Sequence, residues 1–220
     1  MSMSEELTNY LKPTRYINSD HEAIRSLVAD IDVAGVSAVD AAVKLFYWVR
    51  NEIRYNPFAP MLAPDDYAAT TILGRGFGYC VQKAVLLAAL SRCAGIPCRL
   101  CFADIRSHIV PGDLLKLMGT NLFTYHGYDE FFLDGKWVKA TPAFDPDMCE
   151  KNGFIPVEFD GRSDAVLHAT DRTGRKHIEY VRRIGCYADV PFDDLIQAFE
   201  KVYIRNNPDL LRLWRESSGD

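Results

Sequence analysis

A cysteine stands where a glycine-rich loop meets an apolar helical segment. Residues 74–84 read GRGFGYCVQKA, so Cys80 follows three glycines and opens a strongly helical stretch, Val81 to Ala94. A thiol in the first turn of a helix faces unpaired backbone N–H groups and the positive end of the helix dipole. Both favour the thiolate, which is the nucleophilic form of cysteine. We therefore interpret Cys80 as a catalytic nucleophile.

A cysteine nucleophile needs a base, and the chain offers five histidines. His126 is the predicted base, because it stands near the start of a hairpin strand that can hold it rigidly. His108 lies in a loop and is the alternative. His21 is set aside because a helix N-terminus disfavours an imidazolium. We expect His168 and His177, which belong to a later hairpin, to face solvent.

The hairpin that carries His126 is the clearest one in the sequence. Two apolar runs, Tyr125 to Leu133 and Lys136 to Thr141, flank the dipeptide Asp134-Gly135. Asp-Gly between apolar runs is typical of a two-residue type I′ turn. The turn fixes the register of the two strands.

This register suggests which group orients the base. It places His126 opposite Ala143 if the strands extend that far, and facing or alternate residues share one side of a sheet. Thr141 is then a diagonal neighbour of His126, and Asp145 lies further along the same side, beyond a proline. Both remain candidates for the third member of the site.

The remaining elements must position these groups. The segment that starts at Cys80 is apolar on nearly every side, which is typical of a buried central helix. A strand follows it, and residues 106–124 form a long connection with some helical character. Helices followed by antiparallel strands indicate an α+β fold in which helices pack on one side of the sheet. The predicted elements before the hairpin are helices at Asp20–Ala29, Ala38–Ile53 and Cys80–Ala94 and a strand at Cys98–Ile105.

A C-terminal extension of about residues 150–220 follows a core of about residues 20–146. We predict that it adds a hairpin from about Ala165 to Val181, a helix from Phe192 to Ile204 and a short helix that starts at Pro208. The length of 220 residues is typical of one domain, here residues 1–220.

Composition limits the classes of partner and compartment. The chain is 48% hydrophobic with a net charge of −5 and has no basic block, which argues against nucleic acid and against a membrane as partners. The first residues lack the apolar core of a signal peptide, and we expect a cytoplasmic protein. We accordingly expect all six cysteines to be free thiols.

Two motifs together resemble the transglutaminase-like superfamily, which has a papain-type fold. In that family Gly-x-Cys opens an apolar helix that runs to an arginine and a Gly-Ile-Pro-x-Arg segment; residues 91–99 read SRCAGIPCR. The second motif is a His leading into a strand, an Asp-Gly-x-Trp hairpin and an Asp-Pro; residues 126–142 read HGYDEFFLDGKWVKATP. Ile53-Arg54-Tyr55 resembles the helix end before the family's active-site loop. The resemblance covers about Ala38 to Asp145.

The resemblance implies a Cys-His-Asp triad with Cys80 as nucleophile and His126 as base. Where the family has its aspartate before proline, this chain has Thr141. A threonine hydroxyl can accept a hydrogen bond from an imidazole N–H but cannot stabilise an imidazolium as a carboxylate does. Asp145 is the alternative carboxylate. The expected oxyanion hole combines the Cys80 backbone N–H with a side-chain donor, for which Gln82 and Tyr55 are the candidates.

The function that this resemblance implies is thiol-dependent acyl chemistry. We expect a bacterial-type peptidase or amidase that forms an acyl-enzyme on Cys80, acts on a peptide or protein amide, and requires no metal or organic cofactor. Hydrolysis is favoured over transfer to an amine, because short members of the family more often hydrolyse. The alternative is a non-catalytic binding module that keeps the fold, and the substitution at Thr141 favours it.

Overall fold

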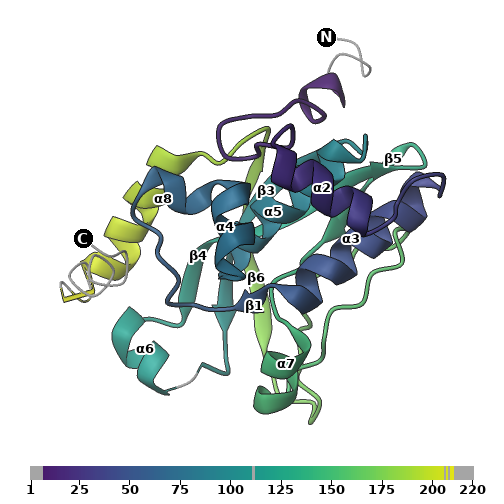
Figure 1. The fold of residues 1–220 in the computed structure, drawn as a ribbon. Helices are drawn as coiled ribbons and strands as arrows, with labels where there is room; N and C mark the ends of the chain where they lie inside the picture. Colours follow the sequence, from purple (N-terminus) through teal and green to yellow (C-terminus); the bar gives the residue numbers. More distant parts are fainter. Residues whose placement is uncertain (1–6, 111, 206, 208, 211–220) are drawn as a thin grey trace.

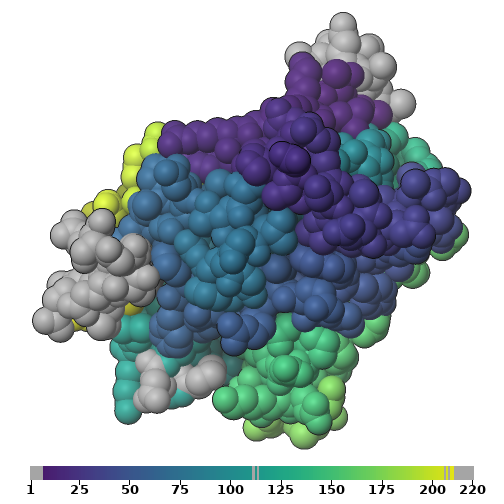
Figure 2. Space-filling model, in the orientation of Figure 1, coloured from purple at the N-terminus to yellow at the C-terminus, as the bar shows by residue number. Residues whose placement is uncertain are grey.

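The computed structural model describes residues 7–110, 112–205, 207 and 209–210. Four helices lie together on one side of a sheet (Figure 1). The space-filling view in the same orientation shows this helical side, formed by N-terminal segments of the chain (Figure 2). These helices are α2 (Glu22–Asp30), α3 (Ala38–Glu52), α4 (Ala69–Arg75) and α5 (Cys80–Cys93).

The main sheet has four antiparallel strands in the order β5-β4-β3-β6. Helices and an antiparallel sheet packed in this way make the fold α+β, as the sequence predicts. A separate pair of short parallel strands precedes α5. The main strands are β3 (Cys98–Ser107), β4 (Leu122–Leu133), β5 (Lys136–Ala140) and β6 (Ile178–Tyr187); the short pair is β1 (Arg54–Tyr55) and β2 (Phe77–Gly78).

The β4–β5 hairpin has the predicted turn and register. Asp134 and Gly135 both have positive φ, 47° and 81°, as a type I′ turn requires. Pairing runs only from the turn to Asp129 and Ala140, so the predicted pairing of His126 with Ala143 is not formed. The strand ends here because the next N–H, that of Thr141, donates to Ala165 and the residue after it is a proline without an N–H.

Helix α5 is the buried centre of the molecule, as its apolar sequence predicts. Its residues from Val81 to Arg92 are all buried. The ammonium of Lys83 donates to the backbone oxygens of Arg50 and Ile53, which ties α5 to the end of α3. The polar side chains that α5 buries thus satisfy backbone groups left free where other elements end.

The long connection after β3 contains the expected helical turns as α6 (Gly112–Met118). A further short helix, α7 (Pro146–Asn152), follows the hairpin. Because β4 begins at Leu122, the irregular part of the connection is shorter than the sequence indicates.

The C-terminal region differs from its prediction in one respect. The predicted hairpin between Ala165 and Val181 is present only around its turn, where an isolated antiparallel bridge joins Thr170 to Lys176 and the His177 N–H donates to the Ala169 oxygen. The strand that follows, β6, pairs with β3. The carboxylate of Asp171 accepts backbone N–H groups of the intervening turn and closes it into a compact loop. The predicted helix after Pro191 is present as α8 (Phe192–Phe199) with a π-helical turn at Glu200–Ile204. The short helix predicted from Pro208 falls largely outside the described residues.

The expectation of six free thiols is wrong for two of them. Cys101 on β3 and Cys186 on β6 form a disulfide, while Cys80, Cys93, Cys98 and Cys149 are free. The two half-cystines are direct partners in the β3–β6 register, with Cα atoms 4.0 Å apart. A separation of 85 residues in sequence hides this pairing until the sheet forms.

No helix among the described residues combines the length and the apolar content needed to cross a bilayer.

Candidate active site

Cys80 occupies the first position of α5, directly after the short strand β2. The residue before it, Tyr79, is extended, with φ −91° and ψ −178°, and its side chain packs inward rather than capping the helix. The pairing of β2 with β1 places Gly78 beside Tyr55, so the loop before α5 is held from both ends. The thiol of Cys80 therefore lies at the edge of the core, where the residue is half-buried.

Gly127 brings the strand that carries His126 against the start of α5. A Cβ atom at position 127 would lie 2.7 Å from the Cα atom of Val81 and 3.0 Å from its Cγ2 atom. Only a residue without a side chain permits this approach. Gly127 thus lets β4 pack closely against α5, and this packing brings His126 near the start of α5.

One cavity joins the two groups that the sequence singles out. Cys80 and His126 both line it, and the space in it that the centre of a water-sized sphere can occupy is about 90 Å³. The backbone N–H of Gly127, next in the chain to His126, interacts with the Cys80 sulfur. The structure therefore brings the predicted nucleophile and the predicted base to the same place.

The protonation states at this site differ from the sequence expectation. Burial raises the pKa of the Cys80 thiol to about 11, and the backbone N–H groups of Gly127, Val81 and Cys80 itself offset only part of that rise. Burial also lowers the pKa of His126 to about 3. Desolvation outweighs the helix N-terminus at this position. The resting pair is a neutral thiol and a neutral imidazole.

Two buried polar atoms near the base lack partners. The Nε2 atom of His126 and the Oγ1 atom of Thr141 are both enclosed and make no hydrogen bond of good geometry with the described residues. The ring of Tyr180 on β6 packs edge-on against His126, with ring centroids 6.0 Å apart. Burial raises the pKa of the Tyr180 phenol, and the nearby Thr141 hydroxyl offsets part of that rise. An unpaired buried polar atom is costly, and both atoms have hydrogen-bonding capacity that the described residues leave unused.

Asp145 has a structural task. It is the N-cap of α7: one carboxylate oxygen accepts the N–H of Met148 at 2.8 Å and the other accepts the N–H of Tyr55 at 2.6 Å. No described contact joins Asp145 to His126. Of the two candidates for the third member, Thr141 has a buried hydroxyl near the Tyr180 phenol that makes no hydrogen bond of good geometry, whereas Asp145 is engaged elsewhere.

The contacts of Gln82 and Tyr55 also distinguish the two candidate donors of the oxyanion hole. The side-chain amide of Gln82 donates to the backbone oxygens of Pro60 and Asp66 and accepts from the N–H of Tyr79, so all its capacity holds the loop before α5. Tyr55 lines the cavity, and burial raises its pKa well above the usual value, so its phenol stays protonated and can donate.

One histidine, His177, lies differently from its prediction. His177 does not face solvent: it is buried, lines the same cavity as Cys80, and its ring stacks on Phe154 with centroids 3.9 Å apart. Its Nδ1 atom makes no hydrogen bond with the described residues, and burial lowers its pKa to about 4. His108, the alternative base, pairs with Glu179 at 3.0 Å.

Sequence reasoning missed both His177 and Tyr180 as members of the site. Residues 176–183, which read KHIEYVRR, start a strand whose polar composition is typical of an exposed edge. His177, directly before β6, lines the cavity, and Tyr180 on β6 packs against His126.

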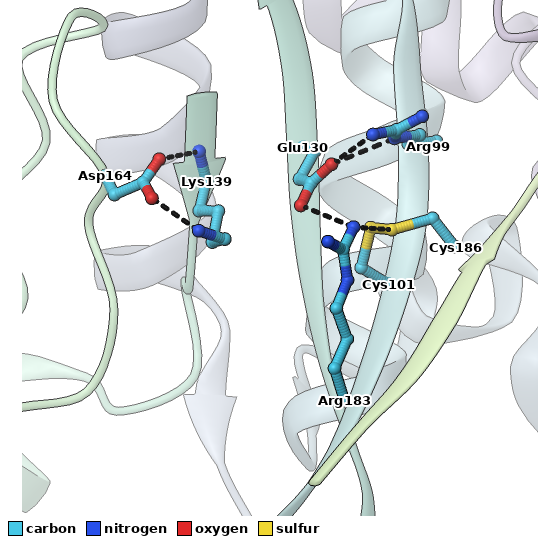
Figure 3. Close-up of polar contacts among 7 residues, drawn as sticks. All are labelled: Arg99, Cys101, Glu130, Lys139, Asp164, Arg183 and Cys186. Atoms are coloured by element: carbon cyan, nitrogen blue, oxygen red, sulfur yellow. Dashed lines mark hydrogen bonds and ion pairs between the residues drawn. A yellow bond between two sulfur atoms is a disulfide. The ribbon is translucent and has the colours of Figure 1, made fainter. Parts of the chain in front are cut away.

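The opposite end of the sheet holds a cluster of charges and sulfur. Glu130 on β4 accepts from Arg99 at 2.6 Å and from Arg183 at 3.3 Å, and Arg183 also contacts Cys186 of the disulfide (Figure 3). Cys101, Cys186 and Glu130 are close enough to ligate a metal together. In this structure the two sulfurs are bonded to each other and the carboxylate is paired with arginines, so the group does not fit a metal.

A family comparison covers more than half of the chain. Residues 25–142 match the sequence profile of the transglutaminase-like superfamily. This match includes Tyr55, Cys80, Gln82, His126 and Thr141, and it ends before Asp145. No match was found among curated proteins.

The chain also resembles solved structures of low sequence identity. A candidate cysteine protease from Cytophaga hutchinsonii is 15% identical with a TM-score of 0.49, over 83% of this chain and 54% of that one. The periplasmic domain of TgpA from Pseudomonas aeruginosa is 17% identical with a TM-score of 0.46, over 64% and 48%. A candidate protease from Parabacteroides distasonis is 18% identical with a TM-score of 0.39, over 62% and 25%. The chain thus spans about half or less of the length of these proteins.

Proposed function

This chain belongs to the transglutaminase-like superfamily, and on that premise we propose that it is a thiol-dependent hydrolase of amide bonds that forms an acyl-enzyme on Cys80. The observation that supports this most directly is the shared cavity of Cys80 and His126, in which the Gly127 N–H meets the sulfur. A peptide or protein amide is the proposed substrate class.

The resting charges define how the reaction begins. Because the pKa of Cys80 is raised and that of His126 is lowered, the thiol keeps its proton until a substrate carbonyl is in place. His126 then takes the proton as the sulfur attacks the carbonyl carbon. The carbonyl oxygen becomes an oxyanion, for which the Cys80 N–H and the Tyr55 phenol are the proposed donors.

The tetrahedral intermediate collapses when His126 gives its proton to the leaving amine, and the carbon–nitrogen bond breaks. Water then attacks the thioester, with His126 as the base that accepts the water proton. The carbon–sulfur bond breaks, the acid is released, and the proton returns to the Cys80 sulfur. The proposed cycle uses the side chains of the protein and one water molecule.

Thr141 is the proposed positioning residue for His126. Its hydroxyl and the His126 Nε2 atom are both buried and make no hydrogen bond of good geometry with the described residues, and a hydrogen bond between them would fix the tautomer of the ring. Thr141→Ala should lower kcat and leave KM nearly unchanged, because the residue does not touch substrate. Asp145→Ala should mainly reduce stability, by about 1 kcal/mol for the lost helix cap. If neither variant loses activity, Cys80 and His126 act as a dyad.

The proposal is tested by labelling with a thiol electrophile, followed by a screen of peptide and amide substrates. Site-resolved mass spectrometry should find label on Cys80, and turnover should disappear in Cys80→Ser and in His126→Ala. Cys93→Ser is a matched control, because Cys93 is a free cysteine at the other end of α5. Turnover that persists without Cys80 contradicts the proposal.

The alternative function is a non-catalytic peptide-binding module. Thr141 in place of a carboxylate favours it, since no charged side chain among the described residues raises the pKa of His126 against the effect of burial. In that case peptides should bind equally well to wild type and Cys80→Ser, and no substrate of the screen should be turned over.

The cytoplasmic location remains a prediction. The Cys101–Cys186 disulfide is the observation that weighs against it, because disulfides persist mainly in oxidising compartments. Fractionation of cells that express the natural chain, with alkylation of free thiols at lysis, tests both the compartment and the state of this pair.

A further inference from the structure

The cavity extends well beyond the space that the reacting groups need. The space in it that the centre of a water-sized sphere can occupy is about 90 Å³, whereas one water molecule needs about 10–15 Å³ of such space. A site for water and one amide group does not require this room. The surplus volume therefore indicates space for a substituent of the substrate.

The cavity wall carries no charge. Among the described lining residues there is no lysine, arginine, aspartate or glutamate, and burial keeps the two lining histidines neutral by lowering the pKa of each. An ionised group that entered this space would lose its hydration and meet no counter-charge. The cavity therefore selects against charged substituents.

Most hydroxyl groups of the wall are already used by the protein. Thr124 donates to Asp104, Ser107 donates to the backbone oxygen of Ile109, and the Tyr79 hydroxyl bonds to that of Tyr67. The lining groups with unused hydrogen-bonding capacity include the His126 Nε2 and His177 Nδ1 atoms. Few polar groups of the wall are left to recognise a polar substituent.

The apolar part of the wall is adaptable. Met61, Met118 and Met148 lie among aliphatic and aromatic side chains in the same wall. Methionine is unbranched and flexible, and it fits itself to apolar groups of different shape. The wall therefore suits a class of bulky apolar groups rather than one ligand.

We propose that this cavity is the acyl-group site and that the substrate delivers a bulky, uncharged, apolar acyl group to Cys80. The inference rests on the proposed acyl-enzyme, since the acyl group is the part that stays attached to the sulfur while water replaces the leaving amine. A peptide substrate would then present a large apolar residue at the scissile carbonyl. Acyl groups with a carboxylate or an ammonium are excluded.

The test varies the acyl group and keeps the leaving group constant. The probes are the 4-nitrophenyl esters of acetate, hexanoate and succinate, and their reaction with glutathione corrects for intrinsic reactivity. Corrected kcat/KM should be at least tenfold higher for hexanoate than for acetate, because four methylenes enter the cavity. The anionic succinate ester should be at least tenfold poorer than the acetate ester. Equal rates for all three esters overturn the proposal.

A charged variant of the wall gives the sharper comparison. Met148 is half-buried on α7, so Met148→Lys should fold and place an ammonium at the cavity. The preference for hexanoate over succinate should fall at least tenfold in this variant. Glu150→Gln changes the net charge by the same amount at an exposed position of the same helix, and it should keep the wild-type preference. A preference unchanged by Met148→Lys contradicts the assignment of the cavity.

Binding separates this inference from the proposed chemistry. Calorimetry on the Cys80→Ala protein should detect hexanamide and give at least tenfold weaker binding of acetamide and of succinamate. If the Cys80→Ala protein binds with this preference but the wild type turns over no substrate, the proposed acyl-group site stands and the proposed hydrolase activity is refuted. If the wild type turns over substrates without this preference, the proposed hydrolase activity stands and the proposed acyl-group site is overturned. Selectivity that follows the amine of matched amides, and not the acyl group, assigns the cavity to the leaving side and also overturns it.

Discussion

Substituting Gly127 tests the contact on which the site geometry depends. A methyl group at this position would lie 2.7 Å from the Val81 Cα atom, where an ordinary contact needs about 3.4 Å. Relief requires a shift of about 0.7 Å between α5 and β4, and the first obstacle is backbone, which cannot rotate away. Overpacking of this kind costs about 1–3 kcal/mol of folding free energy.

The same shift should reduce catalysis more than stability. The displaced elements carry Cys80 and His126, and a misplacement of about 1 Å between reacting groups can cost roughly a hundredfold in rate. We expect Gly127→Ala to remain folded, to unfold at lower urea concentration by an amount that corresponds to about 1–3 kcal/mol, and to lose at least tenfold in kcat/KM. Urea unfolding followed by circular dichroism and steady-state kinetics on the best amide substrate measure the two effects.

Gly74 supplies the matched control. It lies in α4, its φ is not positive, and a Cβ atom there would meet nothing within 4 Å. Gly74→Ala should therefore stabilise the protein by about 0.5–1 kcal/mol, because alanine loses less backbone entropy in a helix, and activity should not change. If Gly127→Ala is as stable and as active as wild type, the close approach of α5 and β4 does not position the site, and the reasoning is refuted.

Three further predictions follow from charges and cross-links. Alkylation of Cys80 by iodoacetamide should be slower than that of a free cysteine near neutral pH and should rise up to about pH 10, because its pKa is raised to about 11; a plateau near pH 7 in site-resolved labelling would contradict this. Burial lowers the pKa of Lys83 to about 7, so above that pH only the unfolded chain keeps the proton on this side chain. Urea unfolding should therefore show a free energy of unfolding that rises between about pH 7 and pH 8.5. Lys83→Met should flatten this rise, and an equal slope in the two proteins would contradict the assignment to Lys83. Reduction of the Cys101–Cys186 disulfide, which spans 85 residues, should lower the free energy of unfolding by about 2–4 kcal/mol, and identical urea curves with and without a reductant would show that it adds no stability.

The sequence determined the features that depend on local order. The buried α5, the Asp134-Gly135 turn and the register of the hairpin all follow from apolar patterning and turn chemistry within short stretches, and the structure confirms them. The same local patterns identify Cys80, at the start of the predicted helix, and His126, near the start of the predicted hairpin strand. Their catalytic roles are still predictions.

Tertiary structure decided what depends on distant neighbours. The disulfide joins residues that become neighbours only when β6 pairs with β3, and His177 enters the cavity with the same strand. Asp145 becomes a helix cap because Pro146 starts a short helix beside Tyr55, and no spacing in the hairpin reveals that. The pKa of Cys80 shows the difference most clearly. Its place at a helix start favours the thiolate, but desolvation by the surrounding fold raises the pKa, and the depth of burial is set by packing that no local stretch of sequence contains.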